Sequence, residues 1–458
     1  MKKFDVVVIG AGPGGYTLAA QLSSNGKKVA LIERNKLGGT CVNIGCIPTK
    51  SLITSARSVL SMKKAADYGV KVADFKVLLA KIAQNAADVS AKLNGAIAGA
   101  LEGAKVKVFQ GKTAKFLDDK TIDLEGEKIT AEKFVIATGS RSRQFKITNS
   151  AKAAGTGRLI HSTSAIALTE LPEKLVIIGT GVVALEFAFY FSTLGSKVIL
   201  LEYGPKAMPA YDRDLANEIE KMLKQNHVEI FTDVRFKEFD DELDLVIEHG
   251  GKTLKVKADK YFAAVGRYAN SELANGVVDI DERGNIVVDE FLRTSKPHIY
   301  AMGDVTGKKM LSSVSYKHGD QVFQHIMGLD VDKVNVDHIP SSLYLSLDVA
   351  SVGRNEQQLE KDGVKFEKIV VSSGQLPRLH AEQNTSFGFI KLLVDPKEDR
   401  LLGAHLILKD ASLLINTLAL AVSGKIKLHD LFTIGHTHPT VSEGIYYALR
   451  GHYLKNNF

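Results

Sequence analysis

The residues with the clearest chemical potential are Cys41 and Cys46, the two cysteines of the chain, which lie in one short segment of residues 38–50. A metal site would need further thiols or histidines at regular spacing nearby, and none lie close in the sequence. A structural disulfide that closes so short a loop would add little stability to a chain of 458 residues. The pattern therefore favours a redox-active thiol pair.

The backbone between the cysteines must depart from a regular helix if they form a disulfide. In an α-helix, residues five apart have Cα atoms about 8–9 Å apart, and a disulfide spans at most about 7 Å. Gly45 lies between the cysteines and Pro48 follows them, so a local distortion is available. A strained, accessible disulfide is also more easily reduced.

A glycine-rich loop of the dinucleotide-binding type precedes the cysteines. Gly10, Gly12 and Gly15 follow an apolar strand and open a helix, after which a second strand over residues 29–32 ends in Glu33. The unit recurs at residues 175–202, where Gly179, Gly181 and Glu202 take the equivalent places. Each loop would present backbone N–H groups and a helix N-terminus to a pyrophosphate, and each glutamate would bind ribose hydroxyls. Two bound dinucleotides are therefore expected.

The acidic residue of the second unit bears on the choice of nicotinamide cofactor. Glu202 would repel the extra 2′-phosphate of NADP and occupy its space, so NAD is expected to bind better. No arginine follows Glu202 closely, although Lys206 could take a 2′-phosphate. NADP use remains the alternative.

The remaining sequence predicts an α/β chain of about three domains, since 45% of the residues are hydrophobic and 24% are charged. Residues 52–101 are predicted to be helical. Residues 134–140 and 299–305 are predicted to contain strands that end in turns, and the C-terminal third has the pattern of a separate α+β domain. The expected fold is two Rossmann-like dinucleotide-binding domains followed by that α+β domain.

Composition argues against several other classes. The net charge is +7, but the lysines are spread along the chain without interleaved aromatic residues, so nucleic-acid binding is not expected. The apolar run at residues 413–422 is about half the length that crosses a bilayer, so membrane insertion is not expected. The N-terminal apolar run leads into a glycine loop instead of a cleavage site, and we expect a cytoplasmic protein.

These motifs together resemble the flavin-dependent pyridine nucleotide-disulfide oxidoreductases over essentially the whole chain. The resemblance rests on both glycine loops, the cysteine segment and three further segments, namely residues 137–139, 301–304 and 436–443. Within the family, the cysteine segment is most similar to that of dihydrolipoamide dehydrogenases, because it runs from a Gly-Gly pair to an Ile-Pro-small-Lys ending.

The resemblance implies FAD on the first unit, NAD on the second and a homodimer formed by the C-terminal domain. The implied ranges are 1–145 and 267–335 for the FAD-binding domain, 146–266 for the NAD-binding domain and 336–458 for the dimerisation domain. The implied cofactor-binding residues are Gly10, Gly12, Gly15, Glu33, Gly39, Thr40, Lys50, Thr138, Gly139, Gly179, Gly181, Glu186, Glu202, Gly266, Gly303 and Asp304. No metal site is expected.

The resemblance also assigns catalytic roles. Cys41 would exchange with the substrate disulfide, Cys46 would interact with the flavin, and Lys50 would lie by the flavin. Glu186 would lie near Lys50 and the nicotinamide, and Asp304 would bind the ribityl chain.

A histidine and a carboxylate near the C-terminus would complete the site from the partner subunit. His438 would act as the base, because a thiolate and not a thiol is the nucleophile, and Glu443 would orient its ring. Without the family, His436 rivals His438 almost equally. A metal pair made by His436 and His438 is a further alternative.

Some segments depart from the family pattern, which bears on the substrate. Residues 311–319 and 344–353 lack several of the usual residues, and prolines are missing after Gly139. The expected reaction oxidises dihydrolipoyl groups, with a lipoylated acyltransferase or other lipoyl carrier as partner. The alternatives are an NAD(P)H-dependent reductase of another small disulfide, such as glutathione disulfide, and a weakly active flavoprotein that serves as a docking subunit.

Overall fold

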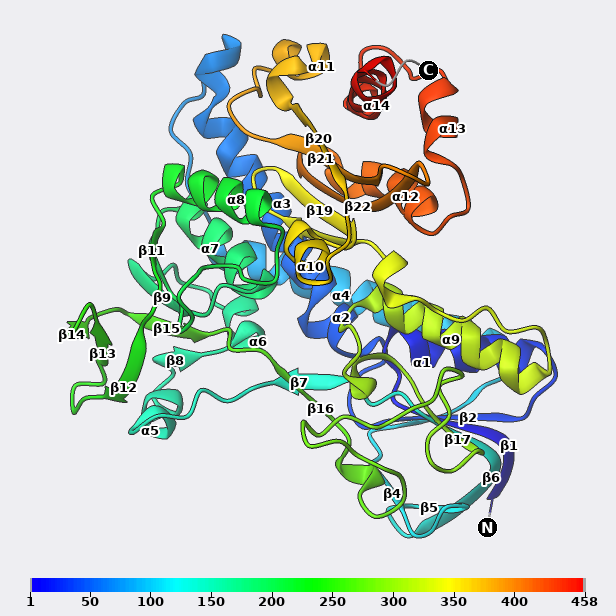
Figure 1. The fold of residues 1–458 in the computed structure, drawn as a ribbon. Coiled ribbons are helices and arrows are strands. Elements are labelled where there is room, and N and C mark those ends of the chain that lie inside the picture. Colours follow the sequence, from blue (N-terminus) through cyan, green and yellow to red (C-terminus); the bar gives the residue numbers. More distant parts are fainter. Residues whose placement is uncertain (1, 456–458) are drawn as a thin grey trace.

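The computed structural model describes residues 2–455 and contains three larger sheets with helices packed against them (Figure 1). The first sheet has the order β3-β2-β1-β6-β5-β4. Strand β17 lies outside this order and pairs in parallel with residues 134–136 of β6. Val7 at its centre is fully buried and lies opposite Ala30 on β2 and Phe134 on β6. Near-continuous apolar strands of this kind are typical of parallel strands that are covered on both faces. The strands are β1 (Lys2–Ile9), β2 (Val29–Glu33), β3 (Lys107–Gln110), β4 (Ala114–Phe116), β5 (Thr121–Leu124), β6 (Glu127–Ile136) and β17 (Ile299–Ala301).

Two helices from distant parts of the sequence lie side by side against this sheet. They are α1 (Pro13–Ser24) and α9 (Ser312–Met327), and both are visible at the right of Figure 1. A side-chain carbon added at Gly14 would come within 2.5 Å of the Ser315 carbonyl oxygen, so the small residue permits this close packing. The first turns of both helices therefore lie near one another. A short 3₁₀ turn, η3 (Gly303–Thr306), lies between β17 and α9 in the sequence.

The cysteine segment and the following region form three helices, α2 (Gly39–Ile44), α3 (Cys46–Lys63) and α4 (Leu79–Gly103). The prediction of continuous helix over residues 52–101 is wrong between α3 and α4. There the chain forms a 3₁₀ turn, η1 (Ala65–Tyr68). Residues 70–78 follow and form neither helix nor strand. Gly69 ends the turn with a φ of 74°, a conformation that stops a right-handed helix.

The second nucleotide unit forms its own five-stranded parallel sheet, ordered β11-β10-β9-β15-β8. Its strands are β8 (Leu159–Ile160), β9 (Lys174–Ile178), β10 (Lys197–Leu201), β11 (Glu229–Phe231) and β15 (Lys260–Ala263), and its helices are α5 (Ser150–Gly155), α6 (Ser162–Ile166), α7 (Val182–Leu194) and α8 (Arg213–Gln225). A separate three-stranded antiparallel sheet also belongs to this unit. Its strands are β12 (Arg235–Phe239), β13 (Leu245–His249) and β14 (Lys252–Val256). A two-stranded ribbon of β7 (Ser140–Ser142) and β16 (Arg267–Ala269) joins this unit to the first sheet.

The C-terminal third forms an antiparallel sheet with helices, as the pattern predicted. The order is β18-β19-β22-β21-β20, and the strands are β18 (Ser341–Tyr344), β19 (Asp348–Gly353), β20 (Glu367–Ser372), β21 (Phe389–Asp395) and β22 (Arg400–Leu408). The helices are α10 (Glu356–Lys361), α11 (Pro377–Ala381), α12 (Ala411–Val422), α13 (Leu428–Thr433) and α14 (Glu443–Lys455); the remaining 3₁₀ turns are η2 (Glu272–Ala274), η4 (Val336–His338) and η5 (Ser373–Gln375). The predicted fold class is confirmed.

The apolar run at residues 413–422 lies in α12, with one side on the core. Leu414, Ile415 and Leu418 are buried, whereas Leu413 and Leu420 are exposed in the single chain. Within residues 2–455, no helix is both long and apolar enough to cross a membrane.

One hydrophobic core joins the three parts of the chain. It contains Leu52 and Ile53 of α3, Phe187 of α7, and Leu343 and Val349 of the C-terminal sheet. Because α3 packs directly against α7, the end of the cysteine segment meets the helix of the second nucleotide unit. This packing sets the geometry of the site described next.

Candidate active site

The two cysteines lie on either side of a break between two helices. Helix α2 ends at Ile44, helix α3 begins at Cys46, and Gly45 between them has φ −137° and ψ −116°. A side-chain carbon at Gly45 would lie 2.8 Å from the Thr40 carbonyl oxygen, so a larger residue would disturb the break. Cys41 and Cys46 are both free thiols in this structure. The expected distortion of the helix is present.

The thiol pair is electrostatically asymmetric. A hydrogen bond from Cys41, together with Ser312 and the charge of Lys50, lowers the pKa of Cys46 to about 6, against the opposing effect of burial. The same hydrogen bond and burial raise the pKa of Cys41. Cys46 is therefore the sulfur that ionises more readily, and Cys41 is the one that keeps its proton.

An ion pair lies beside the thiols at the junction of α3 and α7. Lys50 Nζ lies 2.7 and 2.9 Å from the two carboxylate oxygens of Glu186, which is 3% exposed. The Tyr344 N–H donates to the same carboxylate at 3.2 Å, and the Tyr344 ring lies 4.9 Å from the Lys50 ammonium. Burial raises the pKa of Glu186, and Lys50 opposes this effect. The Lys50 ammonium of this pair lowers the pKa of Cys46, and the Glu186 carboxylate opposes that effect.

The first glycine loop fits the pyrophosphate-binding role. A side-chain carbon at Gly39 would lie 2.7 Å from Gly12 Cα, whereas one at Gly12 would meet open space. Glu33 is buried and its carboxylate accepts hydrogen bonds from the Ala11 and Asn35 N–H groups, both at 2.8 Å. The carboxylate is therefore oriented by the loop itself.

A cavity of about 2070 Å³ connects this loop with the thiols and the Lys50–Glu186 pair. Its volume exceeds the roughly 300–1,000 Å³ of ordinary small-molecule pockets, so a dinucleotide can be accommodated. Predicted site residues on its wall include Gly10, Gly12, Gly15, Glu33, Gly39, Thr40, Cys41, Cys46, Lys50, Thr138, Gly139, Glu186, Gly303 and Asp304. The fold thus brings most of the predicted cofactor residues to one cavity.

A second cavity, of about 520 Å³, lies at the glycine loop of the second unit. Gly179, Gly181 and Glu202 line it, and a side-chain carbon at Gly181 would meet open space. The Glu202 carboxylate accepts hydrogen bonds from Thr180 Oγ1 at 2.6 Å and from the Gly204 N–H at 2.9 Å. The two glutamates therefore lie in closely similar settings. Gly266 has a φ of 98° and follows the end of β15.

Asp304 is held at the end of β17 by residues from the two-stranded ribbon. Ser140 Oγ donates to its carboxylate at 2.6 Å, and Arg267 Nε donates to Ser140 Oγ at 2.7 Å. Burial lowers the pKa of Arg267, against the attraction of Asp304. Thr138 Oγ1 donates to the Asn270 carbonyl oxygen at 2.6 Å, which fixes the neighbouring turn.

The C-terminal histidine and glutamate form a hydrogen-bonded pair. His438 Nδ1 lies 2.9 Å from Glu443 Oε1, and the Thr440 N–H donates to the other oxygen at 2.9 Å. Although burial acts to raise it, these hydrogen bonds lower the pKa of Glu443. His436 instead lies 3.5 Å from the Leu431 carbonyl oxygen. Only His438 of the two has a carboxylate to orient it in the described residues, and its side chain is 68% exposed in the single chain.

His318 occupies an unusual position behind the Gly303–Asp304 turn. It is 1% exposed on α9, and its Nδ1 accepts a hydrogen bond from the Gly303 N–H at 3.1 Å. Burial, with a smaller contribution from Lys308, lowers the pKa of His318 from 6.5 to about 4. The ring is therefore neutral where it supports this turn.

We expect His318→Gln to flatten the dependence of stability on pH. Between pH 6.5 and about 4, the unfolded chain binds a proton at His318 that the folded chain excludes, so acidification favours unfolding. The wild type should lose roughly 2 kcal/mol more than the variant between pH 6.5 and about 5, because each pKa unit corresponds to about 1.4 kcal/mol. Urea unfolding of both proteins at several pH values measures this difference, and equal pH slopes would contradict it.

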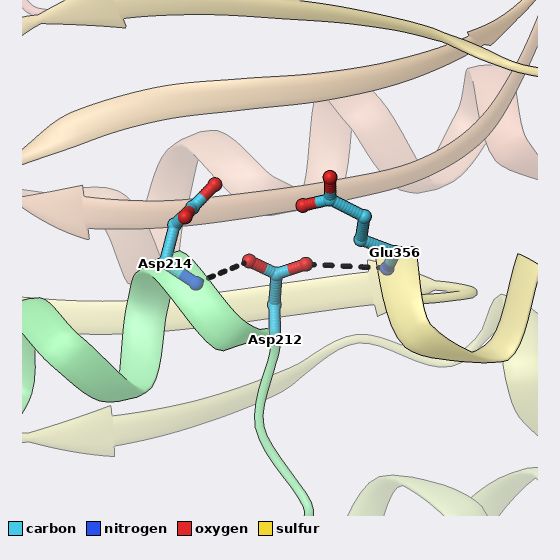
Figure 2. A group of neighbouring side chains, drawn as sticks. All are labelled: Asp212, Asp214 and Glu356. Atoms are coloured by element: carbon cyan, nitrogen blue, oxygen red, sulfur yellow. Dashed lines mark hydrogen bonds between the residues drawn. The ribbon is translucent and has the colours of Figure 1, made fainter. Parts of the chain in front are cut away.

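A group of three carboxylates, of which Asp212 and Glu356 are buried and Asp214 is partly exposed, lies between the second nucleotide unit and the C-terminal domain. Figure 2 shows Asp212 and Asp214 at the start of α8 beside Glu356 of α10. Asp212 accepts hydrogen bonds from the Asp214 and Glu356 N–H groups at 3.1 and 3.2 Å. Lys391 Nζ lies 2.7 Å from Asp212, 2.7 Å from Asp214 and 2.5 Å from Glu356, and Lys391 is fully buried. A lysine ammonium therefore supplies the cation here.

A second acidic group, Asp240, Glu242 and Asp244, is likewise paired with basic side chains. Lys255 lies 2.7 Å from Asp240 and also contacts Glu242, and Arg158 lies 2.9 Å from Asp244. Neither acidic group contains His436 or His438.

Sequence reasoning missed three residues that the structure brings to the site. Ser312 lies 3.6 Å from Cys46, Arg267 binds Ser140, and His318 supports the Gly303 N–H. Ser312 and His318 lie in residues 311–319, which depart from the family pattern. That departure was the signal in the sequence that could have pointed to these two residues. Arg267 directly follows the predicted Gly266, but nothing local indicated its partners.

Comparison with known proteins agrees with this geometry. Residues 4–319 match the family model for pyridine nucleotide-disulphide oxidoreductases, and residues 339–449 match the model for the dimerisation domain of these enzymes. A dihydrolipoyl dehydrogenase of Mycoplasma pneumoniae is 32% identical over 446 residues, covering 96% of this chain and 97% of the relative. One from Thermus scotoductus is 35% identical over 457 residues, covering 97% and 96%.

A solved structure with a similar fold carries a different description. The HOCl-induced flavoprotein disulfide reductase RclA from Escherichia coli, as a Cu(II) complex, superimposes with a TM-score of 0.86 at 28% identity. The match covers 98% of this chain and 99% of RclA. The comparisons thus support a FAD-dependent disulfide oxidoreductase, and the names of the relatives differ.

Proposed function

Since the chain belongs to the pyridine nucleotide-disulphide oxidoreductase family and is a FAD-dependent disulfide oxidoreductase, we propose that it oxidises dihydrolipoyl groups and reduces NAD. The observation that carries the proposal is the Cys41–Cys46 pair at the break between α2 and α3, beside the Lys50–Glu186 ion pair and on the wall of the cavity at the first glycine loop. The pKa of Cys46 is lowered and that of Cys41 is raised, which agrees with two different roles for the sulfurs. The dihydrolipoyl substrate is supported by the relatives that share nearly the full length of the chain.

The residues that would hold the cofactors follow from the two cavities. FAD would be bound by Gly10, Gly12, Gly15, Glu33, Gly39, Thr40, Lys50, Thr138, Gly139, Gly303 and Asp304 of the first cavity, and NAD by Gly179, Gly181 and Glu202 of the second. Glu186, on the wall of the first cavity, and Gly266, which lines neither cavity, are proposed as NAD-binding residues from the family resemblance. Bound FAD supplies two-electron chemistry between a dithiol and NAD. Glu202 favours NAD over NADP because a 2′-phosphate would meet its carboxylate.

The thiol steps follow from the roles of the two sulfurs. A substrate thiolate attacks the Cys41 sulfur of the Cys41–Cys46 disulfide, the S–S bond breaks, and Cys46 leaves as the thiolate. The second substrate thiol then attacks the substrate sulfur of the mixed disulfide, which forms the lipoyl disulfide and releases Cys41. The substrate loses two electrons and two protons, and the enzyme disulfide gains the two electrons. A low thiol pKa at Cys46 makes it the better leaving group.

His438 of the partner subunit would take the substrate protons, with Glu443 as the residue that orients it. Its Nδ1 is occupied by Glu443, so Nε2 is the nitrogen available to a thiol. The exposure of His438 in the single chain and the match to a dimerisation domain both support a site that is completed across a homodimer.

We expect His438→Gln to lower kcat for dihydrolipoamide oxidation about a hundredfold, since a positioned general base contributes about 10²–10⁴-fold. Reduction of the bound flavin by NADH should persist, because that half-reaction needs no thiol deprotonation. His436→Gln is the matched control and should keep most of the turnover. If His436→Gln were the slower variant, the assignment of the base would be wrong.

We propose residues 1–145 and 267–335 as the FAD-binding domain, 146–266 as the NAD-binding domain and 336–458 as the dimerisation domain. The return of β17 to the first sheet supports the split FAD-binding domain. A lipoylated acyltransferase or another lipoyl carrier as partner, and a cytoplasmic location, stay predictions.

An anaerobic spectroscopic experiment tests the proposed function. Dihydrolipoamide or NADH is added to the FAD-loaded protein, and the flavin spectrum is followed for a long-wavelength thiolate-to-flavin charge-transfer band. We expect the band with dihydrolipoamide, followed by reduction of added NAD. Reduction by NADH without any response to dihydrolipoamide would overturn the lipoyl substrate, and no response to either would favour a docking subunit.

A second candidate is the reduction of another small disulfide at the expense of NAD(P)H. The changed residues of the segment 311–319, which include Ser312 beside Cys46, and the similarity to RclA favour it. NADH consumption with glutathione disulfide, in the absence of lipoamide, separates the two functions.

A further inference from the structure

Ser312, the first residue of helix α9, brings a hydroxyl from outside the cysteine segment to the Cys46 sulfur. Its Oγ lies 3.6 Å from Cys46 Sγ, a hydrogen-bonding distance for sulfur. The residue is far from Cys46 in the sequence and belongs to a different helix. The contact therefore depends on the packing of α9 against α1 and its surroundings.

The two hydrogen bonds to Cys46, from Cys41 and from Ser312, differ in whether the donor is still present when the cysteines form a disulfide. The Cys41 thiol can donate to Cys46 only while both sulfurs are reduced, because the donor is lost when the disulfide forms. The Ser312 hydroxyl is independent of the redox state. It can donate to Cys46 at the moment when the Cys41–Cys46 bond breaks, while Cys41 is held in the mixed disulfide with the substrate and has no proton to donate.

We propose that Ser312 donates a hydrogen bond to the Cys46 sulfur and stabilises it as the leaving thiolate when the disulfide is reduced. The proposal rests on the proposed function through the assignment of Cys46 as the sulfur that leaves. A hydrogen bond from a hydroxyl to a charged thiolate is stronger than one to a neutral disulfide sulfur. The contact therefore strengthens as negative charge develops on the Cys46 sulfur. The start of a 16-residue helix adds the positive end of its dipole at the same point.

Other charged and titratable groups around Cys46 are present in every variant compared below. They are Cys41 on α2, Lys50 on α3, Glu186 on α7, Arg267 on β16 and Tyr316 on α9. Lys50 and Arg267 favour the thiolate, and Glu186 opposes it. The test therefore has to isolate the hydroxyl while leaving these charges unchanged.

The test compares Ser312→Ala with Ser312→Thr, which keeps the hydroxyl, and with Ser313→Ala, which removes a neighbouring exposed hydroxyl. Each FAD-loaded protein is reduced anaerobically by two electrons, and the charge-transfer band is titrated with pH. The midpoint of Ser312→Ala should rise by about one pH unit, in line with the loss of a hydrogen bond to a charged group. Its reduction by dihydrolipoamide in stopped flow should also slow several-fold.

Ser312→Thr and Ser313→Ala should titrate like the wild type. A wild-type midpoint for Ser312→Ala, with the band lost in Cys46→Ser, would overturn the inference about Ser312 alone. Retention of the band in Cys46→Ser would overturn the assignment of Cys46 and the inference together. Flavin content and circular dichroism of each variant establish that the site is folded before the titration is compared.

Discussion

Replacing Cys46 by serine is expected to abolish dihydrolipoamide oxidation, with a loss of at least about 10³-fold in kcat, while FAD stays bound. The loss is large because the serine hydroxyl cannot form the disulfide that accepts the electron pair, and the chain has no third cysteine with which Cys41 could pair. Binding of FAD should persist because the glycine loop and Glu33 are untouched. Steady-state turnover and the flavin absorbance of the purified protein measure the two properties.

Cys41→Ser is the matched control for this experiment. It should also stop turnover, since the exchanging sulfur is gone, yet it leaves Cys46 beside Lys50 and Ser312. We therefore expect a charge-transfer band in Cys41→Ser without added reductant and no band in Cys46→Ser. Substantial turnover by Cys46→Ser would contradict the proposed relay, and the opposite assignment of bands would exchange the roles of the two cysteines.

Replacing Lys391 by methionine is expected to lower the free energy of unfolding by about 4 kcal/mol, because removal of one partner from a buried ionic group typically costs about 3–5 kcal/mol. The variant would leave Asp212 and Glu356 buried without the ammonium that lies within 2.7 Å of both. Although burial acts to lower it, the hydrogen bonds to these carboxylates raise the pKa of Lys391, so the charged form is the one that is stabilised.

Lys368→Met provides a control at the edge of the same group. Lys368 lies 3.2 Å from Glu356, but its side chain is 41% exposed, and exposed pairs contribute at most about 1 kcal/mol. Urea unfolding followed by circular dichroism compares the three proteins at one FAD concentration. Equal midpoints for Lys391→Met and the wild type would show that the ammonium is not needed by the carboxylates.

The local sequence was sufficient to predict the two nucleotide units. A side-chain carbon added at Gly12 or at Gly181 would meet open space in both units. Glu33 and Glu202 each lie at the end of the second strand of their unit, and each carboxylate accepts a hydrogen bond from the glycine loop. Such units are determined by residues within about 30 positions of one another, so their pattern is readable directly. The need for a helix break between the cysteines was predictable for the same reason, because it follows from helix geometry alone.

Other local features were not predictable with the same accuracy. The expected helix over residues 52–101 is interrupted where Gly69 takes a φ of 74°, although the composition of the region favours helix. Propensity summed over a long window does not locate a single turn that tertiary contacts stabilise. Here Tyr68 OH donates to the Glu382 carbonyl oxygen of the C-terminal domain, which lies 314 residues away in the sequence.

Local spacing in the sequence predicted a redox-active thiol pair, two dinucleotide-binding units and a histidine base near the C-terminus, although the residues alone left His436 and His438 almost equal as candidates. The surroundings of these groups depend on tertiary packing. Lys50 meets Glu186, Ser312 meets Cys46, and Lys391 meets three carboxylates because separate helices and sheets pack on a shared core. Hydrogen bonds and charges act over a few ångströms of space and not along the chain, so these partners have no signature in local spacing.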